Sequence, residues 1–122
     1  MEGGEQHPSE NLIRVSLKRN WTFYTFLAKK LLHDHEVVEL HALDTAIANA
    51  VEAAECLIHN GYATLEKMHT DSVEMKRNHG GTIAKAKIFI HLKRTKDFQA
   101  IYDSYEKERN ERLQSQGIEQ EA

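Results

Sequence analysis

The sequence predicts an α/β (α+β) two-layer sandwich, in which a mixed four-stranded sheet packs against two helices in the order strand, helix, strand, helix, strand, strand. Three observations predict this fold. Several short stretches alternate apolar and polar residues, as half-buried strands do. Between them, apolar residues recur at the spacing of amphipathic helices. A turn signal, Asn78-His79-Gly80-Gly81, separates the last two strand-like stretches. The length of 122 residues fits one domain.

The first strand and helix are predicted from residues 12–33. Residues 12–17, LIRVSL, alternate in polarity and predict a short strand. Asn20 can cap the helix that follows, because its side-chain oxygen accepts hydrogen bonds from first-turn amides. The helix is expected to run to about His33. Its apolar residues at helical spacing are Trp21, Phe23, Tyr24, Phe26, Leu27, Leu31 and Leu32.

The second strand and helix are predicted from residues 36–61. Residues 36–42, EVVELHA, predict a strand, and Asp44 or Thr45 can cap the next helix. Gly61 stands where a glycine that ends a helix belongs. Alanines on the buried face would let this helix lie close to the sheet. Its apolar stripe is Ala46, Ile47, Ala50, Val51, Ala54, Leu57 and Ile58.

A long hairpin is predicted over residues 62–94. Residues 62–77 are polar and rich in Thr, Val and Tyr, which suits an exposed strand. Residues 82–94 form the clearest strand, with an apolar inner face and a basic outer face. The inner face is predicted to hold Ala84, Ala86, Ile88, Ile90 and Leu92, and the outer face Ile83, Lys85, Lys87, Phe89, His91 and Lys93.

A C-terminal helix is predicted from Lys96 to about Gln114, with a short apolar stripe of Phe98, Ile101, Tyr102 and Tyr105. This stripe either covers a surface of its own chain or contacts another protein. We therefore divide the chain into a disordered N-terminus (1–10), a compact domain (11–94), a C-terminal helix (95–115) and a disordered tail (116–122).

Charge is unevenly distributed along the chain. The net charge is −3, yet residues 73–96 hold seven basic residues and one acid, Glu74. Such local clustering, more than average charge, is the electrostatic footprint of a site for a polyanion. The alternative is a solubilising strand edge that resists aggregation. We favour binding of nucleic acid, because the bias exceeds what solubility requires.

Nine residues are candidates for contact with nucleic acid. Cations on the two strands of the hairpin could contact a phosphate backbone from both sides, and the loop before the first helix could add two further cations. The amides at the start of that helix could also donate to a phosphate. Phe89 could stack on an unpaired base, although contact with the first helix or with a dimer partner is an alternative. The candidates are Lys18, Arg19, Asn20, Lys76, Arg77, His79, Lys85, Lys87 and Phe89.

Other functions find little support in the sequence. His33-Asp34-His35 invites a metal hypothesis, but the chain has no HExxH motif and no CxxC pair, so we expect no metal and no cofactor. No glycine-rich phosphate loop or nucleophile elbow is present, and we expect no enzyme. The lone cysteine, Cys56, cannot form an internal disulfide. We expect no membrane span and an intracellular location.

Three stretches resemble the Alba superfamily of small dimeric nucleic-acid-binding proteins. These are Lys18-Arg19-Asn20 after the first strand, residues 38–57 (VELHALDTAIANAVEAAECL) and residues 84–92 (AKAKIFIHL). The middle stretch holds the string Ala-x-x-x-Ala-Ile, here residues 42–47. Archaeal members usually carry a basic Arg-Gly-Arg before the second helix, where this chain has Leu43, Asp44 and Thr45. Asp44 would repel a phosphate there, which disfavours duplex-DNA packaging of the archaeal kind.

The pattern is closer to eukaryotic, especially protozoan, Alba-domain proteins. The resemblance implies a non-catalytic protein that binds RNA, single-stranded or structured, with DNA as a further ligand, and that acts in messenger RNA stability or translation. It also implies a homodimer or a heterodimer with another Alba-type subunit, in the cytoplasm and with the nucleus as a second location. Two alternatives are an assembly subunit of a ribonucleoprotein such as RNase P or MRP, and a DNA-compacting chromatin protein.

Overall fold

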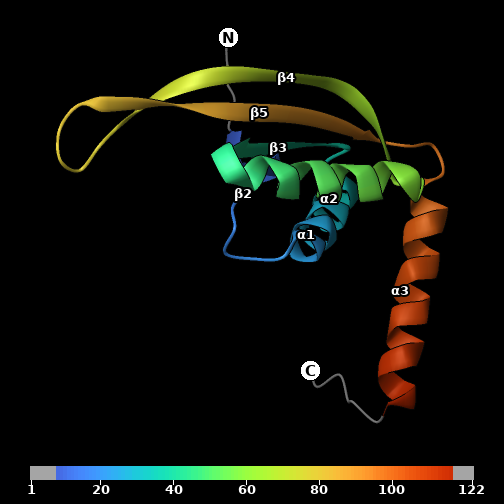
Figure 1. Cartoon of the computed structure of the whole chain (residues 1–122). Helices are drawn as coiled ribbons and strands as arrows, with labels where there is room; N and C mark the ends of the chain where they lie inside the picture. The colour runs from blue at the N-terminus through green and yellow to red at the C-terminus, as the bar shows by residue number, and fades with distance from the viewer. Residues whose placement is uncertain (1–7, 117–122) are drawn as a thin grey trace.

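The computed structural model describes residues 8–116. The sheet has four strands in the order β2-β3-β5-β4, where β2 is Leu12–Val15, β3 is Val37–Leu43, β4 is Ala63–Lys76 and β5 is Thr82–Arg94. Strands β2 and β3 are parallel, whereas β3–β5 and β4–β5 are antiparallel. Helices α1 (Trp21–Asp34) and α2 (Ile47–His59) cover one face (Figure 1). The predicted two-layer α+β fold with a mixed four-stranded sheet is therefore confirmed.

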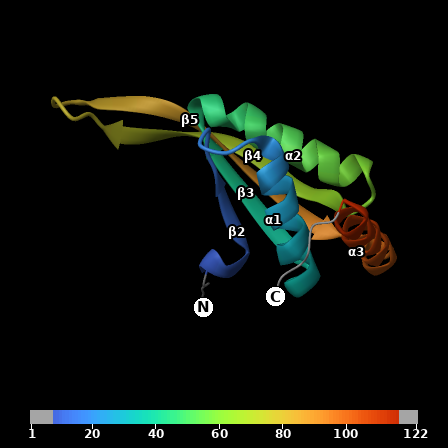
Figure 2. The same ribbon diagram turned by 90° about the horizontal axis from the view of Figure 1, so that it is seen from below.

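The core lies between the sheet and these two helices. Alternate residues of β2, β3 and the inner half of β5 point into it, among them Ile13, Leu40 and Ile90, whereas β4 contributes only Ala63. Helix α2 lies close to the sheet because its buried residues are mainly small: Ala50, Ala53, Ala54 and Leu57. No helix of residues 8–116 lies on the opposite face of the sheet (Figures 1 and 2).

The ends of the elements differ from the prediction in places. Strand β2 stops at Val15, two residues early, and Leu17 beyond it is 63% exposed. Pro8–Asn11 form a short 3-10 turn, η1, which spans the predicted boundary between residues 10 and 11. Residues 1–7 of the expected disordered N-terminus, and residues 117–122 of the expected tail, lie outside the described residues.

The two predicted helix caps have opposite outcomes. The Oδ1 atom of Asn20 accepts a hydrogen bond from the backbone amide of Thr22 at 2.9 Å, so this cap is confirmed. The cap by Asp44 or Thr45 is wrong, because both lie in a 3-10 turn, η2 (Asp44–Ala46), and α2 begins only at Ile47. No side chain caps either element, and Asp44 has a left-handed backbone with φ of 53°.

Strands β4 and β5 form a hairpin that extends well past the helices (Figure 2). The turn at residues 77–81 carries two glycines with positive φ, Gly80 at 98° and Gly81 at 78°. The predicted inner face is correct for Ile88, Ile90 and Leu92, which are buried. Ala84 and Ala86 share that face by the alternation of the strand, but they are exposed because no helix reaches the outer half of the arm.

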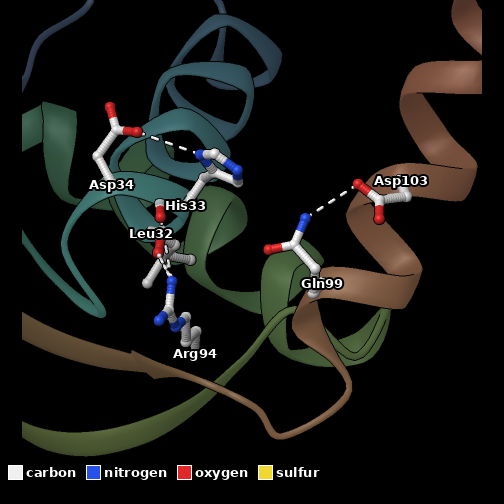
Figure 3. A network of polar contacts seen from close by, with 6 residues as sticks. All are labelled: Leu32, His33, Asp34, Arg94, Gln99 and Asp103. Atoms are coloured by element: carbon white, nitrogen blue, oxygen red, sulfur yellow. Dashed lines mark hydrogen bonds and ion pairs between the residues drawn. The ribbon is translucent and has the colours of Figure 1, made fainter.

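Helix α3 (Phe98–Ser115) packs its first turns on its own chain, which agrees with the first of the two predictions for its apolar stripe. Phe98 is 1% exposed, and the Tyr102 ring stacks on His33 with centroids 4.8 Å apart. Arg94 fastens the same corner, because its Nη1 donates to the carbonyls of Leu32 and His33 at 3.1 and 3.0 Å (Figure 3). The Arg94 guanidinium is therefore used to hold the last turn of α1 and is not counted among the cations available to bind phosphate.

Candidate nucleic-acid interface

A basic groove opens where β2 ends. It is a cavity of about 650 Å³ between the β2–α1 loop, the η2 turn and the start of β5. Four cations line it, Arg14, Lys18, Lys85 and Lys87, against one acid, Asp44. The groove begins where the chain leaves β2 after Val15, which pairs with Ala42 near the end of β3. Cations that converge on one cavity from three segments form a site suited to phosphate.

Three of the nine candidate residues meet in this groove: Lys18, Lys85 and Lys87. Another three, Lys76, Arg77 and His79, lie at the far tip of the hairpin, and all three are exposed (Figure 2). Within residues 8–116, no salt bridge engages these tip residues. The predicted cations therefore form two separate groups, at the base and at the tip of the arm.

The remaining candidates are partly engaged by the protein itself. The guanidinium of Arg19 lies 4.0 Å above the Phe23 ring, although its side chain is exposed. The side chain of Asn20 is used as the cap of α1 and also accepts from the Thr22 hydroxyl at 3.0 Å. The cap uses the Oδ1 atom of Asn20 and orders the helix start behind Lys18 and Arg19.

The β2–α1 loop that carries Lys18 is held by hydrogen bonds from both helices. The Tyr24 hydroxyl accepts from the Ser16 amide at 3.1 Å, and the Ser16 hydroxyl accepts from the Lys18 amide at 3.2 Å. From α2, the Asn49 side chain donates to the carbonyls of Ser16 and Arg19. The loop is thus fixed in position before any ligand arrives.

Phe89 lies on the helix-free face of the sheet, so the expected alternative of contact with the first helix is wrong. The His69 imidazole stacks on its ring with centroids 4.4 Å apart and an interplanar angle of 10°. The His41 ring meets it edge-on at 4.7 Å, and the Lys87 ammonium lies 4.8 Å from its centroid. The ring of Phe89 is therefore already flanked by neighbours.

His41 joins this face to the groove. Its Nε2 lies 3.1 Å from a Glu39 carboxylate oxygen, while its buried Nδ1 has no hydrogen-bond partner among the described residues. Burial lowers the pKa of His41, and the nearby charges of Lys87 and Arg14 act in the same direction against the Glu39 hydrogen bond. His41 is consequently neutral near neutral pH.

Sequence reasoning missed Arg14, His41 and His69. Arg14 is the polar position of an alternating strand and could have been placed on the outer face. The residues beside Arg14 could not be predicted from the sequence. Arg14 pairs in register with His41, which is 27 residues away in the sequence, and the tertiary fold decides that pairing.

Two further findings concern residues 8–116. No group of three or more histidine, cysteine, aspartate or glutamate side chains there could hold a metal ion. No helix of this part is long and apolar enough to cross a membrane.

Comparison with known proteins points to one family. A model of the Alba family matches residues 11–71. An uncharacterised protein of Arabidopsis thaliana is 36% identical over 104 residues, which cover 84% of this chain and 80% of that protein. Among solved structures, ALBA1 from Trypanosoma brucei has a TM-score of 0.76 and 26% identity, with 91% of this chain and 93% of that chain covered.

Alba from Thermoplasma volcanium shares the fold, with a TM-score of 0.63 at 23% identity over 69% of this chain and all of that chain. Alba-family proteins generally bind nucleic acids without catalysing a reaction, and they often form dimers. Since the family model spans half of the sequence, the chain belongs to the Alba family.

Proposed function

We propose that this protein is a non-catalytic RNA-binding protein that holds phosphates in the basic groove. The observation that carries the proposal is the convergence of Arg14, Lys18, Lys85 and Lys87 on one cavity. The cations of the hairpin tip, Lys76 and Arg77 with His79, and the exposed Arg19 supply a second set of contacts on the same strand of RNA. Phosphate contacts of this kind position a nucleic acid and read little sequence.

Two features favour RNA over packaged duplex DNA. Asp44 lines the groove where a further cation would serve a densely charged duplex. The resemblance to eukaryotic Alba-domain proteins, noted from the sequence, points the same way. We infer a role in messenger RNA stability or translation, in the cytoplasm and with the nucleus as a second location. DNA remains a weaker ligand under this proposal.

A second copy of the chain is the partner we propose. Four large apolar side chains are exposed on α2 and on the side of β4 that faces the helices: Val51 at 44%, Ile58 at 37%, Leu65 at 47% and Met68 at 52%. Leu65 and Met68 pair with the buried Leu92 and Ile90, so this surface continues the core outward. Dimerisation here would cover it and leave the groove and the arm free. A related Alba-type subunit could take the same place.

Salt dependence of RNA binding tests the proposal. Anisotropy of a labelled, unstructured RNA of about 20 nucleotides is measured between about 50 and 200 mM salt. Each phosphate contact contributes about 0.7 to the slope of log affinity against log salt for a single strand. Lys85→Ala with Lys87→Ala should reduce that slope by about 1.4.

The matched control is Lys96→Ala with Lys107→Ala, two exposed lysines near and on α3, at the other end of the molecule from the groove. This pair should leave the slope unchanged. Failure of the wild-type protein to bind RNA at low salt would contradict the proposal and favour the role of an assembly subunit. Tighter binding of duplex DNA than of RNA in direct competition would favour DNA compaction.

A further inference from the structure

A single row of side chains crosses the helix-free face of the sheet, one from each strand. Arg14 of β2 pairs with His41 of β3, His41 pairs with Phe89 of β5, and Phe89 pairs with His69 of β4. The alternate residues beside them, such as Leu40 and Ile90, are buried against the helices on the other face. We call these four residues the cross-sheet row.

The two ends of the cross-sheet row differ in how firmly they are held. His41 is half-enclosed, bonded to Glu39 and packed against the edge of Phe89. His69 is exposed, and it lies on the edge strand with one ring face stacked on Phe89. Within residues 8–116, no hydrogen bond or salt bridge engages its imidazole. His69 is therefore the open end of a stack whose inner rings are fixed.

The surroundings of the row match a nucleic-acid strand in charge. Lys87 flanks Phe89 on β5, and Lys67 lies two residues before His69 on β4. The nearest acids are Glu39, which contacts His41 and His91, and Asp71, which is paired in register with Lys87. The exposed aliphatic residues of α2 and β4 that we assign to a second copy lie on the other face.

The row is also continuous with the basic groove. Arg14 and His41 belong to both, and Lys87, which lines the groove, also lies beside Phe89 of the row. From strand geometry, Lys87 and His69 lie about 8 Å apart, which is comparable with the reach from the phosphate of a nucleotide to its base. A phosphate held at Lys87 would thus bring an adjoining base to the open side of His69.

From these observations we propose that His69 is a stacking plate for an unpaired nucleobase, and that the protein thereby selects single-stranded over duplex RNA. The inference rests on the proposed RNA binding and names the form of RNA that the site takes. A base stacked on His69 extends the existing His69–Phe89 stack, and aromatic rings stack on any base because every base has a π face. Bases within a duplex are stacked on each other and are unavailable to it.

The test compares His69→Ala, His69→Phe and a control, His59→Ala, an exposed histidine at the end of α2. Affinity is measured for an unstructured RNA and for the same sequence as a duplex. His69→Ala should weaken single-strand binding by about tenfold and change duplex binding by less than about twofold. His69→Phe should keep most of the wild-type affinity, because stacking survives. The control should match wild type.

A second readout reports the stacking itself. An RNA containing 2-aminopurine should lose fluorescence on binding to wild type and to His69→Phe, and it should keep its fluorescence when saturated with His69→Ala. Equal loss of single-strand and duplex affinity in His69→Ala, or no loss, would overturn the inference while leaving the proposed function intact. A wild-type protein that binds no RNA would overturn both. Thermal unfolding of each variant checks the fold.

Discussion

The side-chain amide of Asn49 on α2 donates to the backbone carbonyl of Arg19 at 3.3 Å and to that of Ser16 at 3.2 Å. This one residue ties the basic β2–α1 loop to the helix that also carries the apolar surface assigned to a second copy. The loop contains no regular structure of its own between Val15 and Trp21, apart from turns. Its position therefore depends on side chains from elsewhere in the chain.

We predict that Asn49→Ala weakens RNA binding by about fivefold, because two hydrogen bonds worth about 1 kcal/mol each no longer order the loop. In a background of Lys18→Ala with Arg19→Ala, the same substitution should cause little further loss, since its effect passes through those two residues. Anisotropy measurements on all four proteins of this double-mutant cycle give the coupling.

The matched control for Asn49 is Asn60→Ala. The Asn60 amide also donates to a backbone carbonyl, that of Cys56 at 2.8 Å, but it lies at the other end of α2 and does not touch the loop. RNA affinity should be unchanged in this variant. Additive losses from Asn49 and the loop cations would show that Asn49 acts independently of them.

Asp44 gives a second prediction. Its negative charge disfavours a phosphate in the groove, whereas its left-handed backbone favours Asp or Asn at this position. Asp44→Asn removes the one acid of the groove and keeps a side chain that tolerates left-handed φ, so RNA affinity should rise by about threefold at low salt with stability unchanged. Asp44→Ala should give the same gain in affinity and cost about 1 kcal/mol of unfolding free energy. Anisotropy and urea denaturation separate the two effects. Lower RNA affinity in Asp44→Asn would mean that this carboxylate serves the site.

His41 makes stability depend on pH in a defined direction. Its folded pKa lies below the ordinary value of 6.5, so the unfolded chain binds the proton more readily than the folded one. The contribution to stability is complete above about pH 6.5 and is lost as pH falls through that value toward the folded pKa. The unfolding free energy should therefore drop from about pH 7.5 to about 5.5.

The measurement compares wild type with His41→Gln, which keeps a polar group near Glu39 and does not titrate. The variant should show a shallower fall in unfolding free energy over the same range of pH. His35→Gln serves as the control and should retain the wild-type slope. Identical slopes in all three proteins would contradict the assignment to His41.

The proposed dimer interface on α2 and β4 can be tested by placing a negative charge in it. Val51→Glu or Met68→Glu should convert a dimer into a monomer in sedimentation experiments, because a carboxylate buried in an apolar interface costs several kcal/mol. Val37→Glu is the control, since Val37 is also exposed, at 39%, but lies on β3. A wild-type protein that sediments as a monomer at high concentration would contradict the proposed dimer.

Local sequence patterns, such as alternating polarity and capping residues, predicted most of this fold. The bounds of β5 match the prediction, Thr82 to Arg94, because its alternation is long and unbroken. The cap at Asn20 follows from one side chain and the amide two residues later. The cap at Asp44 was wrong because no local signal distinguishes a helix start from a left-handed turn that precedes it.

The candidate site was less accessible to sequence reasoning. Lys85 and Lys87 could be placed on the outer face, but not beside Lys18, because that meeting depends on how β2 pairs with β3. The cross-sheet row joins residues as far apart as Arg14 and Phe89, and pairing across such separations is settled by the whole fold. Charge clustering therefore indicated a candidate region, and the tertiary structure divides its residues among a groove, the hairpin tip and the helix-free face of the sheet.

The outer half of the hairpin arm, where Ala84 and Ala86 are exposed, has a consequence for motion. Strand pairing there is supported by few buried apolar contacts, so its amides should exchange with solvent at a much lower opening free energy than those of Ile88 to Leu92. The arm can then bend or part at its tip without loosening the core. The outer half of the hairpin can therefore adapt to the shape of a bound partner while the core keeps its structure. The free energy of this adaptation falls on residues that make few contacts with the core.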